Sequence, residues 1–202
     1  MSTMTTDRLR LWPVIPGTVV IGIAGRARSG KDTMARYIAE MNPGARIQGF
    51  AWALKAYCHV AFGMRAKDSP LLQNVGTDVF RHRAPLVWIR TLYWMLVNDP
   101  VPVLIIPDIR FTNEVEFVKD VGGYVVHVSR VESDGTPYHL AHTDRDPGHA
   151  SETGMDPQSC DERFVIQSGD FAMLKDVASL VNVRAHDHHA AVCTPAVVAL
   201  WE

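Results

Sequence analysis

The stretch GIAGRARSGKDTMARYI, residues 22–38, decides how the rest of the chain is interpreted. Gly25, Gly30 and Lys31 fit the spacing G-x-x-x-x-G-K, in which glycines let backbone N–H groups turn inward around a phosphate and the lysine adds a mobile positive charge. An apolar run precedes the motif as a buried strand would, and an amphipathic helix pattern begins at Lys31. The stretch therefore predicts a strand, a phosphate-binding loop and a helix in that order.

One position departs from the motif. Asp32 stands where Ser or Thr is expected, and Thr33 comes one place late. The helix dipole alone stabilises an acid in the first turn by about 0.3–1 kcal/mol. Beside a triphosphate, however, a carboxylate needs a cation or a substrate group between the two anions. We therefore hypothesise that Asp32 faces the reaction centre, where it holds Mg²⁺-bound water or positions an acceptor and nearby arginines, while Thr33 supplies the hydroxyl near the metal.

The loop also carries two arginines, which favour anion binding, although solvated surface charge would explain them as well. The residues predicted to bind the triphosphate are Gly25, Arg26, Arg28, Ser29, Gly30, Lys31 and Thr33.

The bulk composition excludes several classes of protein. The chain has 202 residues, 47% of them hydrophobic, which is enough for one core and one domain. With 20 Lys and Arg against 22 Asp and Glu, no bulk attraction to nucleic acid or membranes is expected. Cys58, Cys160 and Cys193 are widely spaced, so neither a disulfide framework nor a zinc knuckle is predicted. No secretory h-region and no apolar run of about 20 residues is present, and we expect a cytoplasmic protein.

Strand patterns and helix patterns alternate along the chain. Apolar runs predict buried strands at 18–24, 101–108 and 124–130, with weaker candidates at 46–51 and 164–168. Helical spacing recurs at 31–41, 52–62, 71–83, 85–99, 113–122 and 171–183, where Gly122 and Gly123 close the fifth of these helices. This alternation predicts an α/β fold with a mainly parallel sheet and helices on both faces.

One segment breaks the alternation. Residues 131–156 are polar and rich in turn formers, which predicts a lid, a binding loop or disorder. We expect an N-terminal extension over 1–16, one domain over 17–185 and a tail over 186–202.

Two histidine-rich stretches invite a metal interpretation. In the first, the candidate ligands are His139, His142, His149, Asp144 and Asp146; the second is HDHH at 186–189. No cysteines and no H-E-x-x-H pattern accompany them, so polar lid surface and an exposed tail beyond the last helix are the favoured interpretations.

Five segments together resemble the bacteriophage deoxynucleoside monophosphate kinases. They are GKDT at 30–33, LLQNVGTDVFRHRAPLVWIR at 71–90, IIPDIRFTNEVEFVKDVGGYVVHVSR at 105–130, HASE at 149–152 and FVIQSGDFAMLKDVASLV at 164–181. The resemblance covers most of residues 18–182. Pro107 departs from it, because the family strands usually run apolar up to the following Asp, and we expect Pro107 to mark the end of the strand.

The resemblance implies a three-layer P-loop kinase with a mobile lid. It implies transfer of the γ-phosphate of ATP to a deoxynucleoside monophosphate (dNMP), with Mg²⁺, and a phage-encoded enzyme acting in the host cytoplasm. A kinase of the same fold acting on another small phosphorylated metabolite is the main alternative, and a nucleotide-dependent binding protein or switch is a third. The sequence fixes neither the accepted bases nor the sugar preference. The apolar stretch 85–97 is either a homodimer interface or core.

Phosphoryl transfer has to bring two anions together, and arginine forks are suited to this task. Arg81, Arg110 and Arg130 are the candidates, each in a family-like segment. Asp108 follows a buried strand at the sheet edge where α/β proteins bind ligands, so it is a candidate for Mg²⁺ or its water. The predicted catalytic residues are Lys31, Asp32, Arg110 and Arg130, and the predicted metal ligands are Asp32, Thr33 and Asp108.

The remaining candidates concern the acceptor. Gln73 is suited to a base edge, and Trp88 either stacks on a base or belongs to the core. Glu114 either carries helix N-terminal charge, with Asn113 or Thr112 as the cap, or contacts an arginine in the cleft. The predicted substrate-binding residues are Gln73, Arg81, Trp88, Asp108, Arg110, Glu114 and Glu152.

Overall fold

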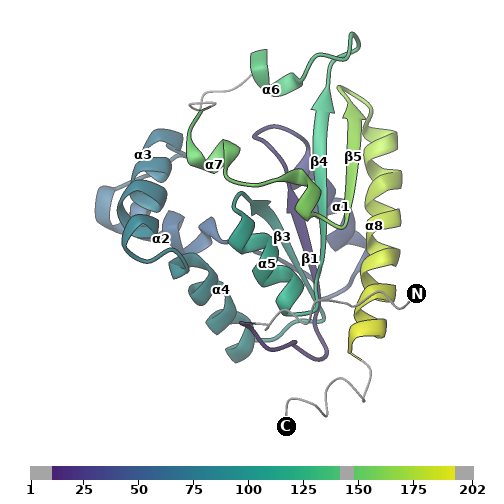
Figure 1. The fold of residues 1–202 in the computed structure, drawn as a ribbon, viewed down its shortest axis with the longest axis horizontal. Helices are drawn as coiled ribbons and strands as arrows, with labels where there is room; N and C mark the ends of the chain where they lie inside the picture. Colours follow the sequence, from purple (N-terminus) through teal and green to yellow (C-terminus); the bar gives the residue numbers. More distant parts are fainter. Residues whose placement is uncertain (1–10, 142–147, 194–202) are drawn as a thin grey trace, which may run out of the picture.

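The computed structural model describes residues 11–141 and 148–193, whose strands form one five-stranded sheet in the order β2-β3-β1-β4-β5. All four neighbouring pairs are parallel, as the alternating pattern predicts (Figure 1). The strands are β1 (Val19–Ala24), β2 (Arg46–Ile47), β3 (Val103–Ile109), β4 (Tyr124–Val131) and β5 (Glu162–Gln167).

Helices connect these strands and cover both faces of the sheet. They are α1 (Lys31–Met41), α2 (Ala51–Phe62), α3 (Ser69–Gln73), the π-helix η1 (Asn74–Arg81), α4 (Val87–Asn98), α5 (Thr112–Asp120), α6 (Tyr138–Ala141), α7 (Ala150–Thr153), the 3₁₀-helix η2 (Pro157–Ser159) and α8 (Phe171–Val192). Figure 1 shows α6 near the arrowhead of β4, and α7 lower down, between α3 and β4 in that view.

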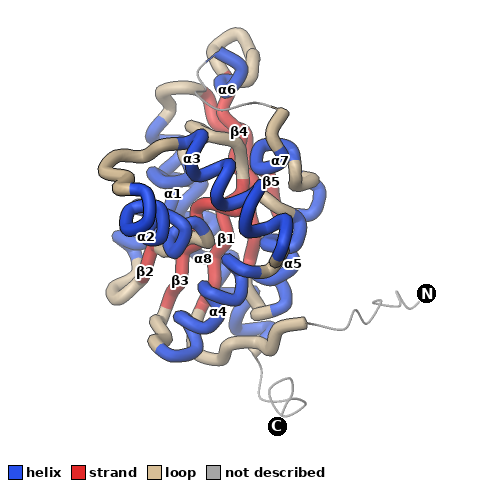
Figure 2. The backbone as a smooth tube through the Cα atoms, turned by 90° about the vertical axis from the view of Figure 1, so that its left-hand side faces the viewer, coloured by secondary structure: helices blue, strands red, loops and turns tan. Residues whose placement is uncertain are grey.

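Two apolar clusters, one on each side of the sheet, make the structure three-layered. One joins the sheet to α1 and α8, where Ile21, Met34 and Val181 are fully buried. The other joins it to α2, α4 and α5, with Phe117 and Leu96 at its centre. Figure 2 shows α2 and α4 in front of the strands. Burying side chains on both faces fixes the sheet, so its carboxyl edge is a rigid platform.

The strand containing Pro107 extends further than the sequence predicts. Pro107 lies inside β3, which continues to Ile109. The register with β1 shifts there, because Gly22 pairs with Ile106 whereas Ala24 pairs with Ile109. Proline lacks an N–H to donate, so it is tolerated at such an irregularity. The prediction that Pro107 ends the strand is therefore wrong.

Two helices also differ from their predicted form. Residues 71–83 form α3 followed by a π-helix rather than one α-helix. The last helix runs on to Val192, so the HDHH stretch at 186–189 lies on α8 and not beyond it. The predicted end near residue 183 is wrong because Ala185 is buried and extends the apolar face of the helix.

No helix within the described ranges is both long and apolar enough to cross a bilayer.

Candidate active site

The loop between β1 and α1 has a backbone that few residues adopt. Gly25, Arg28 and Gly30 have φ angles of 139°, 61° and 97°. A Cβ on Gly25 would lie 2.2 Å from the carbonyl oxygen of Val128, so only glycine fits. Arg28 is the single non-glycine residue with positive φ among the described residues. Such unfavourable backbone is common where a loop must hold its N–H groups in one arrangement.

Lys31 lies across this loop. The residue is only 6% exposed, and its Nζ donates to the carbonyl oxygen of Arg26 and to Ser29 Oγ, at 3.3 Å from the latter. Asp32 is exposed, whereas the hydroxyl of Thr33 accepts a hydrogen bond from Arg36 at 3.3 Å. The ammonium of Lys31 is therefore buried against the loop between β1 and α1.

A cavity of about 410 Å³ opens beside Lys31. Residues from the phosphate loop, from α2 to α4 and from the end of β3 share its wall. The lining residues are Ala27, Arg28, Lys31, Asp32, Phe50, Ala51, Leu54, Lys55, Lys67, Ser69, Leu72, Gln73, Gly76, Thr77, Arg81, Trp88, Pro107, Asp108, Arg110, Phe111 and Glu114. The structure therefore gathers one loop lysine and two of the three candidate arginines around a single space, but it leaves Thr33 outside this lining.

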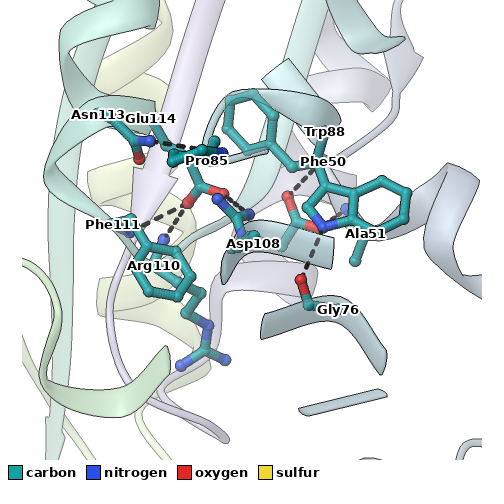
Figure 3. A network of polar contacts seen from close by, with 11 residues as sticks. Phe50, Ala51, Gly76, Pro85, Trp88, Asp108, Arg110, Phe111, Asn113 and Glu114 are labelled. Carbon is teal, nitrogen blue, oxygen red and sulfur yellow. Dashed lines mark hydrogen bonds and ion pairs between the residues drawn. The ribbon is translucent and has the colours of Figure 1, made fainter. Parts of the chain in front are cut away.

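Asp108 faces the start of α2. Its two carboxylate oxygens accept hydrogen bonds from the N–H groups of Phe50 and Ala51, each at 2.9 Å (Figure 3). A Cβ on Gly49 would lie 2.0 Å from Asp108 Oδ1, so the approach depends on glycine. Asp108 thus satisfies helix N–H groups, and a carboxylate placed there is also favoured by the helix dipole.

Glu114 is the hub of a buried polar network. Its carboxylate pairs with the guanidinium of Arg81 and accepts the backbone N–H groups of Arg110 and Phe111, at 2.7 and 3.1 Å. Arg81 also lies over the ring of Phe111, 4.3 Å from its centroid. Figure 3 shows the Arg110 guanidinium directed away from the Glu114 carboxylate that binds its backbone. The alternative in which Glu114 contacts an arginine of the cleft is therefore observed.

The residue before α5 differs from both predicted caps. The N-cap is Phe111, which offers no side-chain cap, and Asn113 instead donates its Nδ2 to the Pro85 carbonyl at 3.3 Å. Thr112 and Asn113 as caps are therefore wrong. The prediction failed because the Glu114 carboxylate, folded back, takes the N-cap amide itself.

Glu114 is buried, with only 1% of the residue exposed to solvent. Desolvation raises the pKa of its carboxyl, and the charge of Arg81 acts in the opposite direction. Removing Arg81 or Glu114 would leave the charge of the other residue buried without its ion-pair partner. The ion pair therefore favours one orientation of the Arg81 guanidinium.

The two acceptor candidates that were expected to meet a base differ in exposure. Gln73 is partly exposed on the cavity wall. Trp88 is 5% exposed, donates its Nε1 to the carbonyl of Gly76 at 3.0 Å and packs against Phe80. Trp88 therefore belongs to the core, and only part of it reaches the cavity wall.

A second, smaller hollow of about 180 Å³ lies beside the first turn of the loop. Arg26, Arg110, His127 and Glu152 are among its lining residues. Arg110 Nη1 and Glu152 Oε2 are 2.9 Å apart, and the same oxygen lies 3.4 Å from the Ala27 amide nitrogen. Burial lowers the pKa of His127, and the charges of Lys31, Arg163 and Arg26 lower it further. Burial and the nearby cations thus disfavour the charged form of this imidazole.

Arg130 is not brought to either of these hollows. Its guanidinium lies 3.6 Å from the centroid of the Tyr138 ring and donates to Ser168 Oγ at 2.8 Å. It joins β4, α6 and the turn after β5.

The metal interpretation of the histidines gains no support. Among residues 11–141 and 148–193, no group of three or more His, Cys, Asp or Glu side chains is placed to hold a metal ion. His142, Asp144 and Asp146 lie outside the described residues. His149 Nε2 lies 3.4 Å from Asp78 Oδ1, which is an ordinary contact between the residue before α7 and η1.

Sequence reasoning missed several residues of the site. Lys55 and Lys67 line the cavity although no motif contains them. Thr77 lies in the family-like segment 71–90, and its spacing of four residues from both Gln73 and Arg81 is the sequence signal that points to it. His127 faces the smaller hollow because β4 pairs it with Ala24, directly before the loop.

Known proteins resemble this chain in sequence and in fold. No protein-family model matches the chain. A viral protein of Acanthamoeba polyphaga mimivirus, described as "Putative deoxynucleotide monophosphate kinase", is 30% identical over 58% of this chain and 78% of its own length.

Solved structures resemble the chain in fold. TT1252 from Thermus thermophilus is 16% identical, with a TM-score of 0.51 over 86% of this chain and 97% of that one. A gluconokinase from Sinorhizobium meliloti 1021 is 16% identical, with a TM-score of 0.48 over 90% and 99%. The fold is the predicted α/β P-loop kinase fold, and the chain belongs to the deoxynucleotide monophosphate kinase family.

Proposed function

We propose that the protein transfers the γ-phosphate of ATP to a deoxynucleoside monophosphate, giving a dNDP and ADP. The observation that carries the proposal is the shared wall of the larger cavity. Lys31 and Asp32 of the phosphate loop line the same space as Gln73, Arg81 and Arg110. A triphosphate in the loop would therefore end at a cavity suited to a second, smaller anion.

The charges in this wall match phosphoryl transfer. The reaction needs positioning and neutralisation more than covalent chemistry. Lys31 supplies a buried positive charge at the loop, and Arg81 and Arg110 supply two planar forks beside it. Because two phosphate groups repel each other, these cations reduce the cost of bringing them into contact.

The donor set also suits Mg²⁺, which commonly binds one or two protein carboxylates together with phosphates and water. Asp32 and Asp108 both line the cavity, and each Asp108 oxygen that accepts an amide keeps a further lone pair. We propose these two carboxylates for the ion, which when bound would neutralise charge on the transferred group. Thr33 is less suited, because it does not line this cavity.

The acceptor base would lie against the η1 side of the cavity. Gln73 offers both a donor and an acceptor, and the hydroxyl of Thr77 stands one turn further along the same wall. Leu54, Leu72 and the edge of Trp88 supply apolar surface for a flat ring. This combination favours a nucleotide over a polyhydroxylated sugar phosphate.

An acceptor panel tests the function. Purified protein is incubated with ATP, Mg²⁺ and each of dAMP, dGMP, dCMP and dTMP, and separately with sugar phosphates, and ADP and the phosphorylated product are measured. We expect at least one dNMP to be converted, and Lys31→Ala to lose at least 100-fold in rate, as expected when a group that neutralises the transferred phosphoryl is removed.

Conversion of a non-nucleotide phosphate alone would replace the proposal with a metabolite kinase of the same fold. Tight ATP binding with slow hydrolysis and no acceptor would indicate a nucleotide-dependent switch. Failure of every dNMP would contradict the proposed function.

A further inference from the structure

We propose that Glu152 is a positioning residue, which orients the Arg110 guanidinium and ties it to the phosphate loop. This inference rests on the proposed function, in which Arg81 and Arg110, here called the acceptor arginines, neutralise the phosphate of the dNMP as it meets the triphosphate. It revises the sequence-based expectation that Glu152 itself binds substrate.

The contacts of the carboxylate carry the inference. Glu152 Oε2 lies 2.9 Å from Arg110 Nη1 and 3.4 Å from the backbone nitrogen of Ala27. The Glu152 side chain is only 4% exposed, and that of Arg110 is 15% exposed. One oxygen thus joins an acceptor arginine to the loop that holds the donor phosphates. A charge-assisted pair of this kind fixes an arginine fork better than solvent does.

Charge excludes direct contact between Glu152 and a phosphate. A buried carboxylate next to a phosphate dianion would be repelled in a medium of low dielectric constant. The carboxylate lines only the smaller hollow, whereas Arg110 lines both hollows. The guanidinium has five N–H donors and needs only some of them for Glu152. Glu152 therefore acts through Arg110 and not on the reacting atoms.

The two acceptor arginines are held by different means. Arg81 is paired with Glu114 of α5 and stacked on Phe111, both of which lie in the same cavity wall. The Arg110 guanidinium is paired with a carboxylate 42 residues away, on α7. The orientation of the Arg81 guanidinium is thus fixed by buried residues next to it, whereas that of the Arg110 guanidinium depends on the position of α7.

The segment that carries Glu152 is itself fixed to the cavity wall. The Gly154 carbonyl accepts the backbone N–H of Thr112 at 3.3 Å, and a Cβ on Gly154 would lie 2.9 Å from the Phe111 ring. The amide of Glu152 donates to the carbonyl of His149 at 2.8 Å. These contacts hold α7 at the end of β3, so the carboxylate is presented rigidly to Arg110.

A double-variant cycle tests the inference. We compare kcat and KM for the accepted dNMP in wild type, Glu152→Ala, Glu152→Gln, Arg110→Ala and the double variant, with the exposed Glu40→Ala as matched charge control. Glu152→Ala is expected to lose 10- to 100-fold, about the cost of misplacing a catalytic group by 1 Å. Glu152→Gln keeps an oxygen acceptor and is expected to recover part of that loss.

The decisive result is the double variant. If Glu152 acts only through Arg110, Arg110→Ala with Glu152→Ala is no slower than Arg110→Ala alone. Losses that multiply in the double variant, or a Glu152→Ala enzyme with unchanged kcat and KM, would overturn the inference.

A measurement that does not depend on catalysis distinguishes failure of this inference from failure of the proposed function. We expect Glu152→Gln and Arg110→Ala each to accelerate amide hydrogen exchange in the peptide covering 148–156, compared with Glu40→Ala. If no dNMP is phosphorylated but both variants loosen this peptide, the function fails while the contact stands. An active enzyme whose peptide exchanges equally in all variants contradicts the inference alone.

Discussion

At the scale of single residues, the site depends on close approaches that leave no room for a side chain. Gly49 allows the Asp108 carboxylate to reach the N–H groups at the start of α2, and Gly25 allows the loop to lie against the carbonyl of Val128. Neither glycine has a Cβ, which allows both close approaches. The carboxylate and the loop are therefore positioned by backbone and not by side-chain packing.

Substitution of Gly49 tests this at one residue. In Gly49→Ala the new Cβ would lie 2.0–2.4 Å from three atoms of the Asp108 carboxyl group, which must then leave the helix start. We expect a loss of about 1–3 kcal/mol in the free energy of unfolding, the cost of amides and a carboxylate left without partners. Urea denaturation measures it.

Asp108→Asn is the matched variant for Gly49→Ala. Because both changes act on the same hydrogen bonds, their effects should be less than additive. Full additivity, or an unchanged stability of Gly49→Ala, would show that the carboxylate does not depend on this glycine.

His127 gives the protein a predictable response to acid. Burial lowers its pKa below the ordinary 6.5, so the folded state releases this proton more readily than the unfolded chain. The unfolded state then binds more protons as the pH falls from about 6.5 toward the lowered pKa, and stability decreases over that interval. We expect the Tm of wild type to fall more steeply between pH 7 and pH 5 than that of His127→Gln. Parallel curves would contradict the assignment.

At the scale of helices and strands, the sequence predicts the buried strands but not the polar end of α8. The strands at 18–24 and 101–108 follow from continuous apolar runs, which a parallel sheet covered on both faces requires. The end of α8 was missed because its last turns carry four polar residues in a row, while their packing is decided by Ala185 and by residues distant in sequence.

The candidate site also has a part that the sequence predicts and a part that it does not. Lys31 and the loop glycines could be predicted, since the motif is local. The role of Asp108 at α2 depends on Gly49, far away in the sequence, and no local pattern reports it. Arg130, predicted to be catalytic from its family-like segment, lies against the ring of Tyr138 and donates to the hydroxyl of Ser168, and no local pattern indicates these contacts.

Truncation of α8 tests the corrected helix end. A chain stopped after Ala185 loses His186, whose Nε2 lies 3.1 Å from Asn42 Oδ1, and Val192, which lies next to Gly122. We expect it to be less stable by about 1–3 kcal/mol, the range for losing a few packed side chains. A chain stopped after Cys193 serves as control and should retain its Tm. Equal stability of the two truncated chains would mean that the last turns contribute nothing.

At the scale of the whole molecule, the site lies between two parts of the chain for which we propose different ligands. The phosphate loop comes from β1 and α1, whereas the opposite cavity wall comes mainly from α2 to α4 and from the end of β3. Each ligand should therefore stabilise the folded protein by its own contacts.

Thermal shift separates the two halves of the site. A ligand that binds only the folded state stabilises it by about 2.7 kcal/mol at roughly 100 times its Kd. We expect a non-hydrolysable ATP analogue to raise the Tm of wild type and of Arg81→Met but not of Lys31→Ala, and the accepted dNMP to raise that of Lys31→Ala but not of Arg81→Met. Each variant's own Tm without ligand is the reference. Loss of both responses in either variant would indicate one undivided site.

Because η1 is a π-helix, the cavity wall proposed for the acceptor depends on the number of residues in this helix. Each residue of an α-helix turns the chain by about 100°, and a π-helix accommodates an additional residue by widening its turns. Deleting one residue between Asn74 and Phe80 would allow ordinary α-helical winding and swing Arg81 away from the buried acid that it faces. In relatives of this chain, gaps and insertions within this short stretch should therefore coincide with a changed choice of acceptor.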